Sequence, residues 1–182
     1  MEKGLRRAVF IDRDGVINKA LLKDNKPHSP RIFSEFEFVP AIGDVLQVFK
    51  KFGFLNIVVT NQPDISRGLM HPEELEKMHK VIKQNLPVDD IFVCPHSDED
   101  NCVCRKPKPE MFFAASRKWK IDIAGSFFIG DSWRDIEAGK RAGCKTILID
   151  ASHNKEINTD YRVSDIVAAM QIICDEKTKR EG

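Results

Sequence analysis

The stretch Ala8–Asn18, AVFIDRDGVIN, constrains the fold of this chain more than any other. Its first four residues are apolar, which is typical of a short strand buried on both faces of a sheet. Asp12 and Asp14 follow directly, with Gly15 behind them. Two carboxylates at the end of a buried strand repel one another and raise each other's proton affinity. The pattern indicates a cation between the acids, or one acid as nucleophile and the other as proton carrier. The alternative is an Asp-Gly turn with solvated acids.

Length and charge bound the possibilities further. A chain of 182 residues suits a single domain, 1–182, with a sizeable core. A net charge of +1 gives no reason to expect nucleic acid or a membrane surface as the main partner. No apolar run is long enough to span a bilayer, and the first residues lack the apolar core of a secretory signal. We therefore expect a cytoplasmic protein, whose five cysteines are thiols or metal ligands rather than disulfides.

Strand-like and helix-like segments alternate along the chain. Strands are predicted at 8–11, 55–59, 91–93, 127–129 and 146–149, and helices at 41–52, 72–82, 109–119, 136–142 and 166–173. The polar stretch Lys19–Glu37, which holds two prolines, is predicted to be a long loop. The charged end, 175–182, is expected to fray. Such alternation predicts an α/β fold, with helices on both faces of a central parallel sheet.

Polar side chains follow the predicted strands where each strand ends. In parallel sheets, ligands bind beyond the carboxyl ends of the strands. We expect the following residues to face one crevice: Asp12 and Asp14 after the first strand, Thr60 and Asn61 after the second, Arg105 and Lys106 in the loop after the third, and Asp131 after the fourth.

Phosphoryl transfer is the chemistry that fits this crevice. Magnesium takes a few hard oxygen ligands, which Asp12 and Asp131 can supply as carboxylates. Asp12 can attack phosphorus to give an aspartyl-phosphate, while Asp14 protonates the leaving alcohol and later deprotonates water. The Thr60 hydroxyl and the Lys106 ammonium would hold the phosphoryl oxygens. The chain has neither G-x-x-x-x-G-K-[ST] nor G-x-G-x-x-G, which argues against a P-loop or dinucleotide enzyme.

A second cluster lies within 94–104. Cys94, His96, Cys102 and Cys104 offer three thiolates and one imidazole within eleven residues, enough to close a tetrahedral zinc site. The alternative is a polar loop with reduced cysteines. Because four protein ligands leave no position for water, the zinc is expected to be structural. Its expected task is to aim Arg105 and Lys106, which follow Cys104 directly.

Four motifs together resemble those of the haloacid dehalogenase superfamily of phosphohydrolases: Asp12-Arg13-Asp14-Gly15, Thr60-Asn61-Gln62, Arg105-Lys106-Pro107, and Gly130-Asp131 followed by Asp135. The resemblance implies a three-layer α/β/α Rossmann-like fold and a magnesium-dependent phosphatase acting on a small phosphate ester. It assigns Asp12 as nucleophile and Asp14 as acid/base, with the Asp14 backbone carbonyl and Asp131 also on magnesium. It further implies that Thr60 and Lys106 stabilise the phosphoryl group.

The cysteine-rich loop resembles one branch of that superfamily. The branch holds D-glycero-D-manno-heptose 1,7-bisphosphate phosphatases and the phosphatase domain of histidinol-phosphate enzymes. The segments 61–68, NQPDISRG, and 36–40, FEFVP, are similar to the heptose enzymes, so a heptose bisphosphate is the expected substrate. Histidinol phosphate stays the alternative, because the five-residue spacer between His96 and Cys102 is closer to that type.

Several residues are expected to contact the substrate: Asn61, Gln62, Arg67, Arg105 and Ser132. By the resemblance, Arg105 recognises the second, non-reacting phosphate, a role that suits a guanidinium fork. Arg67 facing water is an equal alternative. No insertion is long enough for a large cap domain, so short loops and the zinc segment must cover the site. A monomer is expected.

Other side chains carry weaker expectations. Asp135 either anchors the Asp131 loop or Lys106, or is a solvated helix acid. Trp133 is expected to be a packed aromatic, and a lid over the substrate is the alternative. His28, His71, His79 and His153 are interpreted as surface or loop residues.

Two alternatives come from other functional classes. A phospho-accepting receiver domain shares an acidic pocket with Thr and Lys, but it does not need Asp14 as a hydrolytic acid/base. A zinc-knuckle nucleic-acid binder is disfavoured by the near-zero net charge and the few aromatics near the knuckle.

Overall fold

A six-stranded parallel sheet forms the centre of the computed structural model, which describes residues 4–23, 26–151 and 154–181. The strand order is β5-β4-β1-β6-β7-β8, and every neighbouring pair is parallel. The strands are β1 (Ala8–Ile11), β4 (Leu55–Asn61), β5 (Asp90–Cys94), β6 (Phe127–Gly130), β7 (Lys145–Ile149) and β8 (Tyr161–Val163).

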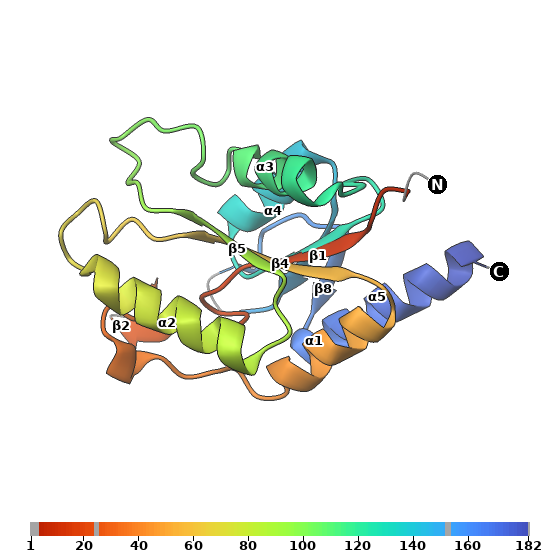
Figure 1. Cartoon of the computed structure of the whole chain (residues 1–182), viewed down its shortest axis with the longest axis horizontal. Coiled ribbons are helices and arrows are strands. Elements are labelled where there is room, and N and C mark those ends of the chain that lie inside the picture. Colours follow the sequence, from red (N-terminus) through yellow and green to blue (C-terminus); the bar gives the residue numbers. More distant parts are fainter. Residues whose placement is uncertain (1–3, 24–25, 152–153, 182) are drawn as a thin grey trace.

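Helices cover both faces of this sheet, as Figure 1 shows. On one face lie α1 (Ile42–Lys51), α2 (Pro72–Asn85) and α5 (Ile166–Glu181), and on the other α3 (Glu110–Trp119) and α4 (Trp133–Ala142). A hydrophobic core lies on each face of the sheet, and successive residues of β1 pack alternately into the two cores. Val9 and Ile11 pack into the first, and Ala8 and Phe10 into the second. The unbroken apolar run therefore reflects burial on both faces, and the predicted three-layer fold is confirmed.

The chain changes its direction across the sheet at β1. From β1 it passes through α1 to β4 and through α2 to β5, so that one half of the sheet forms beside one edge of β1. It then returns to β6, which pairs with the other edge of β1, and continues outward to β7 and β8. At such a switch point the connecting loops diverge and leave a crevice at the carboxyl ends of the strands. The residues that follow β1 open into this crevice.

The prediction of an irregular loop over 19–37 is wrong. Strands β2 (Leu21–Lys23) and β3 (Lys26–His28) pair as an antiparallel hairpin, and a short 3-10 helix, η1 (Phe33–Glu35), follows. Pro27 argued against a strand, but a two-stranded ribbon has free edges, where a residue without an N–H is tolerated. The backbone N–H of Phe33 donates to the Glu74 carboxylate of α2 at 2.6 Å, which ties this segment to the helix.

Two features at the C-terminal end also differ from expectation. Strand β8 was not predicted, since its three residues are too few for a recognisable period. Helix α5 does not stop near 173 but continues to Glu181 through the charged segment expected to fray. Lys145 forms an ion pair with Glu176, and Lys177 donates to the carbonyl of Phe52, so this turn of the helix is held against the body. Gly182 lies outside the described residues.

No separate cap domain covers the crevice within the described residues. Among the same residues, no helix combines the length and the apolar character that crossing a membrane would need.

Candidate active site

A cleft of about 270 Å³ opens at the carboxyl edge of the sheet. Seven of the side chains that the sequence placed at the site line it: Asp12, Asp14, Asn61, Arg105, Lys106, Asp131 and Ser132. Thr60, Gln62 and Arg67 are not among its lining residues. The cleft also contains His28, Ser29 and Arg134, which sequence reasoning did not place there.

The Lys106 ammonium lies at the floor of this cleft. It donates to Asp12 Oδ1 at 2.7 Å, to Asp135 Oδ1 at 2.6 Å and to the carbonyl of Val59 at 2.9 Å. These contacts use all three of its donors, and only 2% of the lysine is exposed. Burial alone would lower the pKa of Lys106, but the Asp12 and Asp135 carboxylates raise it, so the charge is retained.

Asp12 and two further acids form a compact group around this lysine. Oxygens of Asp12, Asp131 and Asp135 lie within 4.8 Å of one another. Burial and the Asp135 charge raise the pKa of Asp12 to about 7, although Lys106 opposes the rise. Burial, Asp135 and Asp12 raise the pKa of Asp131 well above its usual range. One ammonium cannot offset three carboxylates, so the donor set fits an additional hard cation.

Gly15 makes this close approach possible. Its φ is +87°, and a Cβ at this position would lie 2.1 Å from Asp131 Oδ2. A side chain here would therefore displace the Asp131 carboxylate as well as strain the backbone. The position of the Asp131 carboxylate therefore requires a glycine at position 15.

The turn after β6 holds Asp131 and Asp135 in place. Ser132 begins α4 with a capping box, in which its hydroxyl accepts from the backbone N–H of Asp135, and Asp135 Oδ2 accepts from the Ser132 N–H at 3.0 Å. Asn154 donates to the carbonyls of Asp131 and Ile149, each at 2.8 Å. Asp135 is 1% exposed, so it is an anchor for Lys106 and for this turn rather than a solvated acid.

Asp14 is held by a ring of donors. Arg13 Nη2 lies 2.9 and 3.0 Å from its two oxygens, and Asn18, Ser29 and Gln62 donate to it at 3.0, 2.8 and 2.7 Å. Burial alone would raise the pKa of Asp14, but the Arg13 guanidinium and the hydrogen bonds lower it. In this arrangement Asp14 is therefore a carboxylate.

Arg13 is itself fully buried, which is rare for a guanidinium without partners. Besides Asp14 it contacts His79 of α2, with 3.5 Å between Arg13 Nη1 and His79 Nε2. Burial, followed by the Arg13 charge, lowers the pKa of His79 to about 4, so the ring is neutral and can accept this hydrogen bond. The expectation that His79 is a surface residue is wrong. Its partner lies 66 positions away, and nothing local in the sequence reveals it.

The polar residues at the end of β4 and directly after it mostly hold other site residues in place. The Asn61 amide donates to the carbonyl of Lys106 at 3.1 Å and accepts from its N–H at 3.0 Å, which fixes the lysine's loop. Gln62 is fully buried and donates to Thr60 Oγ1 at 2.9 Å as well as to Asp14. Arg67 pairs with Asp64 at 3.4 Å, with 44% of its side chain exposed. The predicted substrate contacts through Gln62 and Arg67 stay predictions.

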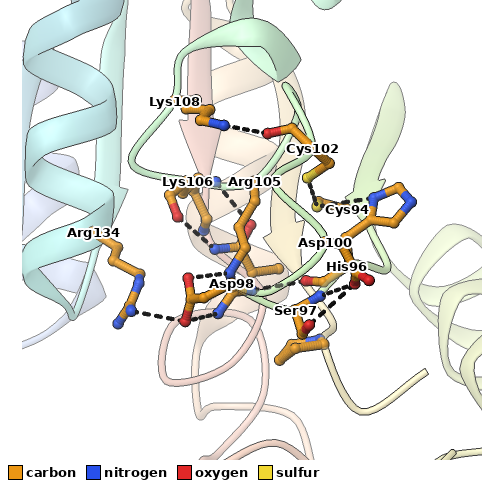
Figure 2. A network of polar contacts seen from close by, with 12 residues as sticks. Cys94, His96, Ser97, Asp98, Asp100, Cys102, Arg105, Lys106, Lys108 and Arg134 are labelled. Carbon is orange, nitrogen blue, oxygen red and sulfur yellow. Dashed lines mark hydrogen bonds and ion pairs between the residues drawn. The ribbon is translucent and has the colours of Figure 1, made fainter. Parts of the chain in front are cut away.

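The four proposed zinc ligands converge at the end of β5 and in the loop after it. Figure 2 shows three of them, Cys94, His96 and Cys102. Cys102 Sγ lies 3.5 Å from Cys94 Sγ and 3.6 Å from Cys104 Sγ, and His96 Nδ1 lies 3.7 and 3.5 Å from the sulfurs of Cys94 and Cys104. A tetrahedron with zinc–ligand bonds of about 2.0–2.3 Å places its corners about 3.5–3.8 Å apart. The residues therefore fit a closed zinc site.

Arg105 leaves this cluster and turns into the cleft. Its Nε and Nη2 donate to Asp98 at 2.8 and 3.3 Å, and its Nη1 donates to the carbonyl of His96 at 3.1 Å. Asp98 also accepts from Arg134 of α4 at 3.2 Å, so the cysteine-rich loop is tied to the helix (Figure 2). Neither Asp98 nor Arg134 was identified from the sequence, because a lone acid and a lone base in polar segments carry no pattern.

Comparisons with known proteins give the family. A HAD-hydrolase-like family model matches residues 103–170. The D-glycero-beta-D-manno-heptose-1,7-bisphosphate 7-phosphatase of Bordetella bronchiseptica is 33% identical over 155 residues, covering 82% of this chain and 84% of that protein. This chain belongs to the haloacid dehalogenase superfamily. The alpha-anomer 7-phosphatase of Campylobacter jejuni is 34% identical over 155 residues, covering 82% of this chain and 86% of the relative.

Solved structures of superfamily members agree with this assignment. The crystal structure of the B. bronchiseptica D,D-heptose 1,7-bisphosphate phosphatase, complexed with magnesium and phosphate, aligns with a TM-score of 0.80 at 27% identity. The alignment covers 93% of this chain and 99% of that one. The phosphatase family predicted from the four motifs is confirmed, and the receiver-domain and zinc-knuckle alternatives are dropped. This chain is a phosphatase of the superfamily, a phosphoric monoester hydrolase.

The His79 contact predicts a pH dependence of stability. The pKa of His79 falls from 6.5 to about 4 on folding, so the unfolded chain takes up the proton first. Neutral His79 therefore contributes fully to the free energy of unfolding above pH 6.5, and this contribution is lost as the pH falls towards 4. For a partly accessible ring we expect the contribution to be about 2 kcal/mol. The difference in free energy of unfolding between wild type and His79→Gln should therefore shrink or reverse over this range in urea titrations. His71→Gln, an exposed histidine next to the same helix, should follow the wild-type profile, and an identical profile for His79→Gln would refute the assignment.

Proposed function

We propose that this phosphatase hydrolyses D-glycero-D-manno-heptose 1,7-bisphosphate to the monophosphate. The observation that carries the proposal is the pairing of Asp12 with Lys106 at 2.7 Å on the floor of a cleft that also holds Arg105. This places a nucleophile beside one cation and leaves a second cation for a remote anion. The relatives at 33–34% identity that are named 7-phosphatases of this sugar support the substrate. A monomer in the cytoplasm stays a prediction.

Magnesium is the cofactor that the acid cluster fits. Asp12 and Asp131 would hold it, because Asp135 is already engaged by Lys106 and Ser132. The backbone carbonyl of Asp14 is the further ligand that the superfamily implies. When bound, the ion would offset the charge of the acids and polarise the phosphoryl oxygens.

Asp12 acts as the nucleophile in this proposal. Lys106 holds Oδ1, and the other carboxylate oxygen forms the bond to phosphorus while the bond to the leaving sugar oxygen breaks. The product is an aspartyl-phosphate, which water then hydrolyses to regenerate Asp12. Lys106 also balances the negative charge that the phosphoryl group brings into a buried site.

Asp14 carries the protons. It must give one to the leaving oxygen and take one from the attacking water. The contacts from Arg13, Asn18, Ser29 and Gln62 favour its charged form, so donation requires Asp14 to leave part of this ring. Asp14 already lines the cleft, and two of its donors, Ser29 after β3 and Gln62 after β4, come from outside the sheet.

The substrate is tested by phosphate release with magnesium, measured side by side on both anomers of heptose 1,7-bisphosphate and on histidinol phosphate. We expect kcat/KM at least about tenfold higher for a bisphosphate, because only that substrate offers Arg105 an anion. An equal or higher value on histidinol phosphate would show that the short spacer between His96 and Cys102 indicates the substrate better than the other motifs do.

Asp12→Asn tests the nucleophile. An amide of the same shape cannot form the phosphoryl ester, so phosphate release should fall by roughly a thousandfold or more, while the circular dichroism spectrum stays the same. Asp44→Asn, at an exposed acid in the first turn of α1, is the matched control and should keep full turnover. More than about a tenth of the wild-type rate in Asp12→Asn would overturn the assignment.

The cysteine cluster is proposed to hold a structural zinc ion, since its four side chains fill all positions of a tetrahedron. Cys102→Ser should lower zinc content by metal analysis and the free energy of unfolding together, the latter by about 2 kcal/mol or more. Cys174→Ser, which changes a thiol of α5 far along the chain from the cluster, is the control. Unchanged zinc in Cys102→Ser would exclude that residue as a ligand.

A further inference from the structure

Two arginines from different elements line the same cleft. Arg105 comes from the cysteine-rich loop and Arg134 from the first turn of α4, and Figure 2 shows both reaching Asp98. Asp98 is not one of the lining residues of the cleft. Asp98 therefore forms ion pairs with both guanidinium groups, which would otherwise repel each other. The donors that do not contact Asp98 remain available to the cleft.

The donors of Arg134 are mostly uncommitted. Its Nη2 donates to Asp98, whereas its Nε is buried and has no hydrogen-bond partner among the described residues. Arg105 already uses Nε, Nη1 and Nη2 on Asp98 and on the carbonyl of His96. A guanidinium group has five N–H donors, so the larger unused capacity of the pair lies on Arg134. A buried donor without an acceptor is costly unless a ligand supplies one.

Arg134 is also held in position. Its guanidinium carbon lies 4.7 Å from the centroid of the Trp133 ring. Trp133 is 50% exposed, so the expectation that it is a packed aromatic is wrong, and the ring serves as a surface on which the arginine stacks. Stacking on one side and an ion pair on the other restrict the guanidinium before any ligand arrives.

We propose that Arg134 is a specificity-determining residue that binds, together with Arg105, the non-reacting phosphate of a bisphosphate substrate. The inference rests on the proposed function, and it adds a residue that no motif assigns to the site. A phosphate group offers three acceptor oxygens, more than the donors that Arg105 leaves unused can satisfy. Asp98 acts as a positioning residue, because it sets the spacing of the two forks without lining the cleft.

Arg134→Gln tests the proposal through a ratio measured within one protein. The quantity is kcat/KM for heptose 1,7-bisphosphate divided by kcat/KM for heptose 7-phosphate, which keeps the reacting phosphate and lacks the other. We expect this ratio to fall about tenfold, mainly through a higher KM for the bisphosphate. Arg134→Lys, which keeps the charge without the fork, should recover part of it. Arg117→Gln, at an exposed arginine of α3 paired with Glu110, should leave the ratio at the wild-type value.

An equal loss on both substrates would show a merely structural role and would overturn the proposal, as would an unchanged ratio. Failure of the proposed function is seen separately, as a wild-type enzyme that cleaves neither heptose. In that case fructose 1,6-bisphosphate and fructose 6-phosphate are tested as inhibitors of aryl phosphate hydrolysis, and the ratio of their inhibition constants is compared between wild type and Arg134→Gln. A preference for the bisphosphate that Arg134→Gln loses supports the role of Arg134, and the same ratio in both proteins overturns it.

Discussion

The buried contact between the Lys106 ammonium and the carboxylates of Asp12 and Asp135 sets the requirements for the rest of the site. A lysine without water needs acceptors for all three protons, and it finds them directly after β1, on β4 and on α4. Those three elements must therefore meet at one point. The parallel sheet brings the two strands side by side, and the capping box at the start of α4 fixes the third acceptor. The lysine thus joins both halves of the sheet at the place where they diverge.

The pKa values of the two acids that follow β1 shift in opposite directions. Asp12 shares its surroundings with other carboxylates, and its pKa rises to about 7, whereas Asp14 faces a guanidinium group and three hydrogen-bond donors, and its pKa falls. Two residues of the same type, two positions apart, therefore meet opposite environments. The difference between their pKa values depends on Arg13, which is buried, pairs with Asp14 and also contacts His79 of α2.

The sequence predicted the parts of this structure that follow from local pattern. The run 8–11 predicts a strand buried on both faces, and the acids and glycine behind it predict a charged turn, because each depends on neighbouring residues only. The pairing of β2 with β3 was missed because these short segments show no apolar alternation and one of them holds Pro27. His79, Asp98 and Arg134 were missed for a different reason. Their partners lie 66, 7 and 36 positions away, and spacing cannot reveal a contact that only the folded chain creates.

The position of β1 at the middle of the sheet has a consequence for how such an enzyme changes over time. Asp12 extends from the strand that is paired on both edges and covered on both faces, the part of the chain least able to open locally. The groups that would meet the rest of the substrate come from a hairpin, a cysteine-rich loop and one helix end, each attached at the rim. Substitutions at the rim can alter which ester is accepted while the bond-breaking centre keeps its geometry. An enzyme of this architecture can therefore change its substrate through single substitutions at the rim, and each intermediate variant keeps the phosphatase reaction.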